Sequence, residues 1–431
     1  MNTSSKKICV VGTGYVGLTT GVCLASLGHE AICVDKAKKK IAKLSKGNCT
    51  IHEPGLEKML VQNLKRLTFT TALREACQKA EFIFIAVGTP GMNNGAPDLS
   101  ALEEVIKQLL GTIETDKIVV IKSTVPIGTS RRIEEKFIKA GKAKVEVLSN
   151  PEFLRQGKAV KDTLNPDRIL IGGSSKTAIA KLRSLYKKIS APIVVTTFEN
   201  AEIIKYASNS FLAMKISYIN EVANLCEKYG ANVKEVAKGM GLDPRIGDRF
   251  LEAGIGFGGS CFPKDMKALA YSARSAGYAF RLLEAALEVN ERQKTIAIEK
   301  LKKYLGKIKG RRIGLLGLTF KPDTDDIREA SSISLISRLL KEKAIVRAYD
   351  PKGEENMKML FRAVHYCDSP YEVASKSDAI ILVTEWDEFK GLDFRRIRKS
   401  MRGKYFIDGR NLLDPKEMTK QGFVYEGIGR K

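Results

Sequence analysis

The sequence has 431 residues, 44% hydrophobic and 28% charged, so it can form the cores of two or three domains and is neither disordered nor fibrous. Apolar runs such as 82–87 are far shorter than the roughly 20 residues that cross a bilayer, which excludes a membrane protein. The apolar stretch after Lys7 stops at Gly12, too early for a secretory signal, which predicts a cytoplasmic protein. The 73 Lys and Arg against 49 Asp and Glu give a net charge of +24, which favours anionic partners such as nucleic acid, anionic lipid or phosphorylated small molecules, although the basic clusters also fit solvated faces.

The first predicted element is a strand over residues 7–11, followed by a glycine turn and a helix to about Leu27. The turn reads Gly12, Thr13, Gly14, Tyr15, Val16, Gly17, and a second strand, 31–34, ends at Asp35. In dinucleotide-binding folds these glycines allow the tight turn, the approach of the pyrophosphate and helix–strand packing, while the acid holds the ribose hydroxyls. We predict NAD, because Asp35 would repel the 2'-phosphate of NADP. The basic residues 36 and 38–40 keep NADP as an alternative.

Two further buried strands, 81–87 and 118–121, end in loops that contain Gly88, Thr89, Pro90, Ser123 and Thr124. Ligands of open parallel sheets lie beyond the carboxyl ends of the strands, so we expect both loops near the cofactor. Strands at 145–148 and 193–195 complete this domain.

The C-terminal third repeats the plan, with strands at 312–317, 344–350 and 377–383. The fold class is therefore α/β, with two doubly wound Rossmann-like domains joined by a long central helical segment. The expected domains are an NAD-binding domain (1–196), a central helical domain (197–305) and a C-terminal nucleotide-sugar-binding domain (306–431). The second turn, 317–321, lacks the full glycine fingerprint and predicts no second dinucleotide site, although Lys321 could neutralise the phosphate of another nucleotide.

The segment from Asn200 to about Tyr229 has helical periodicity. One apolar stripe comprises Ile203, Ala207, Phe211, Met214, Tyr218 and Val222. A second stripe places Lys205 and Asn209 on one face with Leu212 and Ile216. On periodicity alone, a lysine that extends to solvent from the edge of the helix explains this stripe equally well.

Cys261 stands in a glycine-rich loop, with Lys264 and Asp265 three and four residues later. A nearby cation favours the nucleophilic thiolate, although a cysteine in such a loop is also commonly structural. The eight cysteines form no CxxC pair and there are three histidines, so we expect neither a disulfide framework nor a metal site.

Several motifs together resemble the UDP-glucose/GDP-mannose dehydrogenase family over residues 7–412. They are GTGYVG (12–17), STVPIGT (123–129), NPEFL (150–154), the helix 200–209, GFGGSCFPKD (256–265) and FKPDTDDIRE (320–329). The resemblance implies an enzyme that uses two NAD to oxidise the C6 alcohol of a nucleotide sugar to a carboxylate. It implies UDP-glucose as the substrate, with GDP-mannose or another nucleotide sugar as the alternative. It also implies a homodimer, with no nucleic acid or membrane as partner.

The resemblance also implies the site residues. Cys261 matches the nucleophile that forms a thiohemiacetal and then a thioester, and Lys205 and Asn209 match the groups that stabilise the substrate oxygen. Asp265 and Thr124 match residues that position a water, and Glu152 matches an acid/base. The implied cofactor contacts are residues 12–17, Asp35, Lys40, Val87, Gly88, Thr89, Pro90, Ser123, Thr124, Gln156, Lys264 and Arg328. The implied substrate contacts are Glu152, Phe153, Leu154, Lys205, Asn209, Arg245, Phe250, Leu251, Glu252, Ala253, Gly254, Phe257, Gly258, Lys321 and Arg410.

Two positions depart from the family pattern, and a third implies a contribution from the partner subunit. Gln156 stands where the family often has a second acid; it can hydrogen-bond but cannot titrate. Glu252 is not the residue expected there. Arg245 matches an arginine that reaches the site of the partner subunit.

Two other classes of protein are alternatives to a nucleotide-sugar dehydrogenase. A nucleic-acid-binding protein would use the positive charge but explains neither Cys261 nor the Lys205/Asn209 stripe. A dehydrogenase of the 3-hydroxyacid or 6-phosphogluconate type would pair a Rossmann domain with a Lys/Asn helix but needs no cysteine nucleophile.

Overall fold

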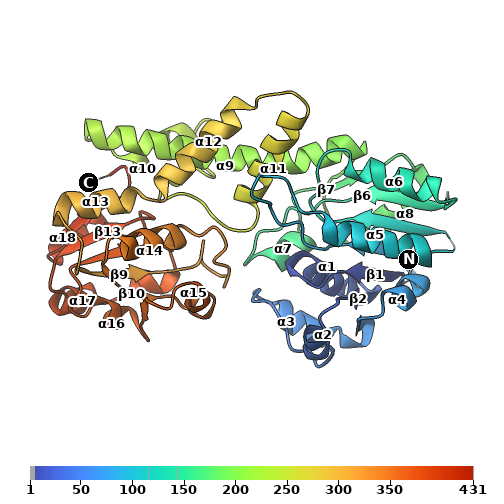
Figure 1. The fold of residues 1–431 in the computed structure, drawn as a ribbon, viewed down its shortest axis with the longest axis horizontal. Coiled ribbons are helices and arrows are strands. Elements are labelled where there is room, and N and C mark those ends of the chain that lie inside the picture. Colours follow the sequence, from blue (N-terminus) through green and yellow to red (C-terminus); the bar gives the residue numbers. More distant parts are fainter. Residues whose placement is uncertain (1–4, 115, 143, 431) are drawn as a thin grey trace. The chain divides into compact units, whose positions relative to one another are not determined.

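The computed structural model, described for residues 5–114, 116–142 and 144–430, forms two compact units (Figure 1). The first comprises residues 1–208 and 267–277, and the second comprises 209–266 and 278–431. Two helices supply residues to both units: α9 (Phe198–Tyr229), the long helix drawn in green, and α11 (Phe262–Ser275). The helix expected from Asn200 to about Tyr229 is therefore confirmed and begins two residues earlier.

The first unit contains an eight-stranded sheet in the order β3-β2-β1-β4-β5-β6-β7-β8, in which neighbouring strands are parallel except β6 and β7. The strands are β1 (Lys7–Val11), β2 (Glu30–Val34), β3 (Leu67–Thr70), β4 (Phe82–Ile85), β5 (Lys117–Ile121), β6 (Val145–Ser149), β7 (Ile169–Gly172) and β8 (Ile193–Thr196). Val11 pairs with both Val34 and Ile85. The glycine turn, Asp35 and the loop after β4 therefore leave the sheet at one edge.

Helices cover both faces of this sheet. They are α1 (Tyr15–Ser26), α2 (Lys38–Ser45), α3 (Leu56–Gln62), α4 (Leu73–Lys79), α5 (Ser100–Thr112), α6 (Thr129–Lys139), α7 (Ala159–Leu164) and α8 (Lys176–Leu185), with a short 3-10 helix at Leu64–Arg66. On one face, Leu18 of α1 and Leu182 of α8 share a core with Phe84. On the other, Leu102 of α5 and Phe137 of α6 pack with Ile83 and its neighbours. Adjacent residues of β4 thus belong to opposite cores, as the alternation of a strand requires.

The second unit contains a fully parallel six-stranded sheet in the order β11-β10-β9-β12-β13-β14. This order repeats that of β3-β2-β1-β4-β5-β6, which confirms two doubly wound domains. The strands are β9 (Arg312–Leu316), β10 (Ile345–Tyr349), β11 (His365–Tyr366), β12 (Ala379–Leu382), β13 (Tyr405–Asp408) and β14 (Val424–Glu426).

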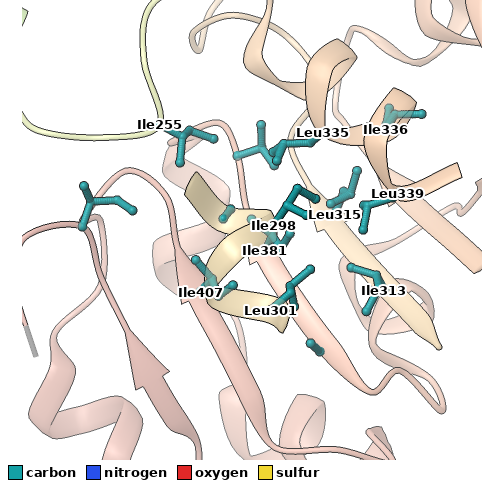
Figure 2. Packing of buried hydrophobic residues seen from close by; sticks show 14 of the residues in the cluster. Ile255, Ile298, Leu301, Ile313, Leu315, Leu335, Ile336, Leu339, Ile381 and Ile407 are labelled. Carbon is teal, nitrogen blue, oxygen red and sulfur yellow. The ribbon is translucent and has the colours of Figure 1, made fainter. Parts of the chain in front are cut away.

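The second unit also contains eight α-helices among its described residues. They are α10 (Val233–Gly241), α12 (Arg281–Gln293), α13 (Ile296–Leu305), α14 (Ser331–Lys341), α15 (Glu354–Leu360), α16 (Pro370–Ala374), α17 (Phe394–Ser400) and α18 (Pro415–Lys420), with a 3-10 helix at Asp387–Gly391. Of these, α13 and α14 contribute to a core with the sheet. Figure 2 shows Leu301 of α13 and Leu335 and Leu339 of α14 packed against Ile313 and Ile381 of the sheet. No helix of the described residues is both long and apolar enough to cross a membrane.

Candidate active site

The glycine turn follows β1 and leads into α1. Gly12 has a φ of 95°, and a Cβ placed on it would lie 2.8 Å from the carbonyl oxygen of Ala86. A Cβ on Gly17 would lie 1.8 Å from the carbonyl oxygen of Gly12, so only glycine lets the helix pack this closely on the turn. A Cβ on Gly14, by contrast, would meet open space. The start of α1 is thus open at Gly14, where the N–H groups of a helix N-terminus can donate hydrogen bonds to a phosphate.

Asp35 is fixed beside this turn. Its carboxylate accepts hydrogen bonds from the N–H and hydroxyl of Thr13 at 3.0 and 2.7 Å and from the N–H of Ala37 at 3.0 Å, and Lys40 Nζ lies 3.2 Å away. Burial alone would raise the pKa of Asp35, but these hydrogen bonds and Lys40 lower it to about 2. Asp35 is therefore an anion at neutral pH. This arrangement fits a dinucleotide whose ribose hydroxyls bind a carboxylate.

The loops after β4 and β5 are tied to each other. Ser123 Oγ donates to the carbonyl of Val87 at 2.6 Å, and Thr89 Oγ1 donates to the carbonyl of Thr124 at 2.8 Å. These hydrogen bonds therefore fix the two loops against each other at the edge of the sheet where the glycine turn lies.

Glu152 and Lys205 form a buried ion pair in the first unit. Lys205 Nζ lies 3.2 Å from Glu152 Oε1, and their side chains are 4% and 6% exposed. Burial alone would raise the pKa of Glu152, but Lys205, the Leu154 N–H and Lys122 together lower it. Lys205 also lies 5.2 Å from the centre of the Phe153 ring. The lysine thus points into the protein, which answers the question that the helical periodicity left open.

Asn209 and Asp265 meet in the second unit. The Asn209 amide donates to Asp265 Oδ2 at 2.6 Å, and Lys264 Nζ lies 2.5 Å from Asp265 Oδ1. Cys261 is half-buried and directly precedes α11, and its carbonyl accepts the N–H of Asp265 at 2.8 Å. A helix N-terminus carries partial positive charge, which favours a thiolate over a thiol.

The loop from Phe250 to Cys261 is held by side-chain hydrogen bonds. Asn290 accepts from the N–H of Phe257 at 2.8 Å and donates to its carbonyl at 3.1 Å. Asn220 Oδ1 accepts the N–H of Gly254 at 2.9 Å, and Gln293 donates to the Gly254 carbonyl at 2.8 Å. The backbone before the cysteine is therefore fixed from α9 and α12.

The remaining predicted substrate contacts fall into two groups. Leu251, Ala253, Gly254, Phe257 and Gly258 are buried in this loop, and Phe250 has a φ of 64°. Arg410 donates to the carbonyls of Gly256 and Val383, both at 2.9 Å. Glu252 is exposed, and Arg245 pairs with Asp243 while its side chain is 88% exposed. Arg328, a predicted cofactor contact, is also exposed and pairs with Asp326.

The second Rossmann-like domain uses its acid differently. Asp350 follows β10 as Asp35 follows β2, but it is 3% exposed. Its Oδ2 accepts from the N–H groups of Leu318 and Thr319 and from Trp386 Nε1 at 2.6, 3.0 and 3.1 Å. Its Oδ1 accepts two more N–H groups, from residues 352 and 353. Protein donors therefore surround this carboxylate.

One group of possible metal ligands lies among the described residues: His365, Cys367 and Glu372. Arg347 Nη2 lies 3.4 Å from Cys367 Sγ and 2.9 Å from Glu372 Oε1. The guanidinium thus supplies the positive charge at this cluster.

Sequence reasoning missed three buried polar groups. Asn290 and Gln293 lie on the same buried face of α12 as Leu283 and Ala286, so polar residues in an apolar stripe were the available signal. Glu53, which lies just before α3, is 6% exposed, and no periodic pattern marked it.

Comparisons with known proteins identify the family and agree with the fold. Residues 6–190 match the NAD binding domain of the UDP-glucose/GDP-mannose dehydrogenase family, residues 199–292 its central domain and residues 314–415 its UDP binding domain. The chain is 44% identical over 430 residues to UDP-glucose 6-dehydrogenase TuaD of Bacillus subtilis (strain 168), covering 99% of this chain and 93% of that protein. It is also 44% identical over 434 residues to UDP-glucose 6-dehydrogenase of Rhizobium meliloti (strain 1021), covering 98% and 99%. The structure of a UDP-glucose dehydrogenase from Pyrobaculum islandicum matches with a TM-score of 0.94 at 37% identity, covering 100% of this chain and 99% of that one.

Proposed function

The chain belongs to the UDP-glucose/GDP-mannose dehydrogenase family, and on that premise we propose that it oxidises UDP-glucose at C6 to UDP-glucuronate with NAD as the oxidant. The observation that carries the proposal is the family's three domains in one chain, together with a cysteine at the start of a helix whose first turn holds the Asn209–Asp265 contact. Neither rival class needs that cysteine.

The cofactor would be held by the turn at residues 12–17, by Asp35 and Lys40, and by the loops after β4 and β5. We also assign Gln156, Lys264 and Arg328 to this role. NAD, when bound, accepts a hydride in each of two successive oxidations. The open space at Gly14 and the anionic carboxylate of Asp35 support this assignment.

The chain's own residues would handle the oxygen and the protons. Lys205 and Asn209 would donate hydrogen bonds to the C6 oxygen as it gains negative charge. Asp265 and Thr124 would hold a water, and Glu152 would exchange protons with it. Because the pKa of Glu152 is lowered, the group is ionised at neutral pH, so it can accept a proton but has none to give.

Cys261 would carry the second half of the reaction. Its thiolate would add to the aldehyde carbon left by the first oxidation, giving a thiohemiacetal. Loss of a second hydride from that carbon would give a thioester. Water would cleave the thioester, releasing the carboxylate and restoring the thiolate. Overall, one alcohol and one water would yield one carboxylate, two reduced cofactors and three protons.

The nucleotide part of the substrate would bind the C-terminal domain, whose family name specifies UDP. Lys321 and Arg410 would contact it, with the loop 250–258 against the sugar. We accordingly assign residues 1–196 to an NAD-binding domain, residues 197–305 to a central helical domain and residues 306–431 to a nucleotide-sugar-binding domain.

A homodimer is supported by the surface of α9. Phe211, Tyr218 and Leu225, seven residues apart, are 63%, 59% and 54% exposed, which forms an apolar stripe along the helix. Two copies of α9 would bury this stripe against each other. The exposed Arg245 would then be available to the partner's substrate.

A cytoplasmic location is supported by the cysteines. All eight are free thiols, which suits a reducing compartment.

The deciding experiment measures NADH formation with a panel that includes UDP-glucose, GDP-mannose and N-acetylated UDP-sugars. We expect UDP-glucose to have the highest kcat/KM, with two NADH formed per sugar. Preference for another nucleotide sugar would replace the substrate, and one NADH per product would overturn the four-electron reaction.

A further inference from the structure

Glu53 is a buried carboxylate next to the cofactor turn. It lies between α2 and α3 and is 6% exposed. Carboxylates are rarely buried unless partners compensate for the lost hydration. Tyr15, Gly157 and Ala159, which hydrogen-bond to it, come from two segments that are far apart in the sequence but belong to the first unit.

The first partner belongs to the glycine turn. The hydroxyl of Tyr15, the first residue of α1, donates a hydrogen bond to Glu53 Oε2. Tyr15 is one of the residues assigned to the cofactor.

The other partners follow the NPEFL segment. Glu53 Oε2 accepts the N–H of Gly157 and Oε1 accepts the N–H of Ala159, both at 2.7 Å. The Gly157 N–H also lies 3.0 Å from the Tyr15 hydroxyl oxygen. Gly157 directly follows Gln156, and Gly157 and Ala159 lie five and seven residues beyond Glu152. One carboxylate therefore fixes the cofactor turn and the end of the substrate segment against each other.

We propose that Glu53 is a positioning residue that couples the cofactor turn to the segment carrying Glu152, so that binding of the dinucleotide strengthens binding of the nucleotide sugar. The proposal rests on the proposed function for the identity of both ligands. Coupling of this kind is reciprocal, so it can be measured from either ligand.

Glu53→Gln tests this with little change in shape. Each carboxylate oxygen accepts an N–H, so an amide must turn its own NH₂ toward Gly157 or Ala159 and lose one of these bonds. Tyr15→Phe removes only the hydroxyl. The matched control is Glu57→Gln, because Glu57 is exposed on α3 and accepts the backbone N–H of Cys49, outside the cofactor turn and the segment after Gln156.

The measurement is the Kd of NADH by fluorescence, with and without UDP-glucose, a pair that cannot react. For wild type and Glu57→Gln we expect UDP-glucose to tighten NADH binding by about fivefold or more. Glu53→Gln and Tyr15→Phe should each lose most of that factor, and the double variant should resemble Glu53→Gln alone. Recording Tm for each protein separates lost coupling from lost folding.

A wild-type factor near one, or an unchanged factor in Glu53→Gln, overturns the proposal. If Glu53→Gln does not fold, an unchanged factor in Tyr15→Phe overturns it in the same way. Wild type that binds both ligands with coupling but forms no NADH from UDP-glucose and NAD would instead overturn the proposed function alone.

Discussion

The side-chain amide of Asn209 donates a 2.6 Å hydrogen bond to the carboxylate of Asp265, and the two residues are 8% and 1% exposed. An amide has two N–H groups, so this bond fixes the orientation of Asn209 and leaves a second N–H in a known direction. Such a donor can stabilise a substrate oxygen without reorganising.

Asn209→Ala should lower kcat about 100-fold, because it removes a donor from the developing oxyanion. The Tm should fall only slightly. Asn224→Ala is the matched control on the same helix; its amide contacts Gln293, and kcat should change less than about threefold. Steady-state kinetics with UDP-glucose checks both, and equal losses in the two variants would contradict the role of Asn209.

Cys261→Ala should bind both ligands and lose overall turnover by several orders of magnitude, since no thiohemiacetal can form. It should still reduce added UDP-6-aldehyde with NADH, because that step needs no covalent bond. Cys261→Ser should stall with the sugar attached as an ester, which intact-mass spectrometry would detect. Normal turnover in the alanine variant would show that the second oxidation proceeds through a free hydrate.

Asp35 should set the cofactor preference. Its pKa of about 2 keeps it anionic, so the 2'-phosphate of NADP should meet a like charge and kcat/KM should favour NAD by about 100-fold or more. Asp35→Ser should reduce that ratio, helped by the nearby Lys40. Equal kcat/KM for NAD and NADP in the wild type would refute this reading.

Lys122 should make stability depend on alkaline pH. Burial lowers its pKa to about 8, so between pH 8 and the ordinary lysine range the unfolded chain binds more protons than the folded one. The free energy of unfolding therefore gains a contribution from Lys122 that rises with pH in that window, by up to about 1 kcal/mol per unit. Urea unfolding at pH 8 and 9.5 should show a smaller rise in Lys122→Met than in wild type. The exposed control Lys107→Met should keep the wild-type slope.

Phe211→Glu should convert a dimer to monomers, because it places a charge in the middle of the apolar stripe of α9. Light scattering after gel filtration measures this. Leu242→Glu changes an equally apolar side chain, 77% exposed and outside α9, and should leave the dimer intact. A wild-type monomer at micromolar concentration would exclude the proposed interface.

The fold was largely predictable because strands such as Phe82–Ile85 and Ala379–Leu382 are continuous apolar runs that end in turn residues. The direction in which the Lys205 side chain points could not be predicted, because a stripe of residues along a helix does not show which face packs against the core. The apolar stripe with Phe211 and Tyr218 is the exposed one, while the stripe with Lys205 and Asn209 is buried. Glu53 and Asn290 were missed because the groups that hydrogen-bond to them lie far away in the sequence.

Asp350 carries a consequence for stoichiometry. Unlike Asp35, this carboxylate is buried, and the indole of Trp386 donates to its Oδ2 in addition to the backbone of residues 318 and 319, which keeps a ribose away from it. In the C-terminal domain, Asp350 therefore makes internal hydrogen bonds at the position where Asp35 of the first domain is expected to bind a ligand. A calorimetric titration should accordingly reach saturation at one NADH per polypeptide, although the chain contains two copies of the fold.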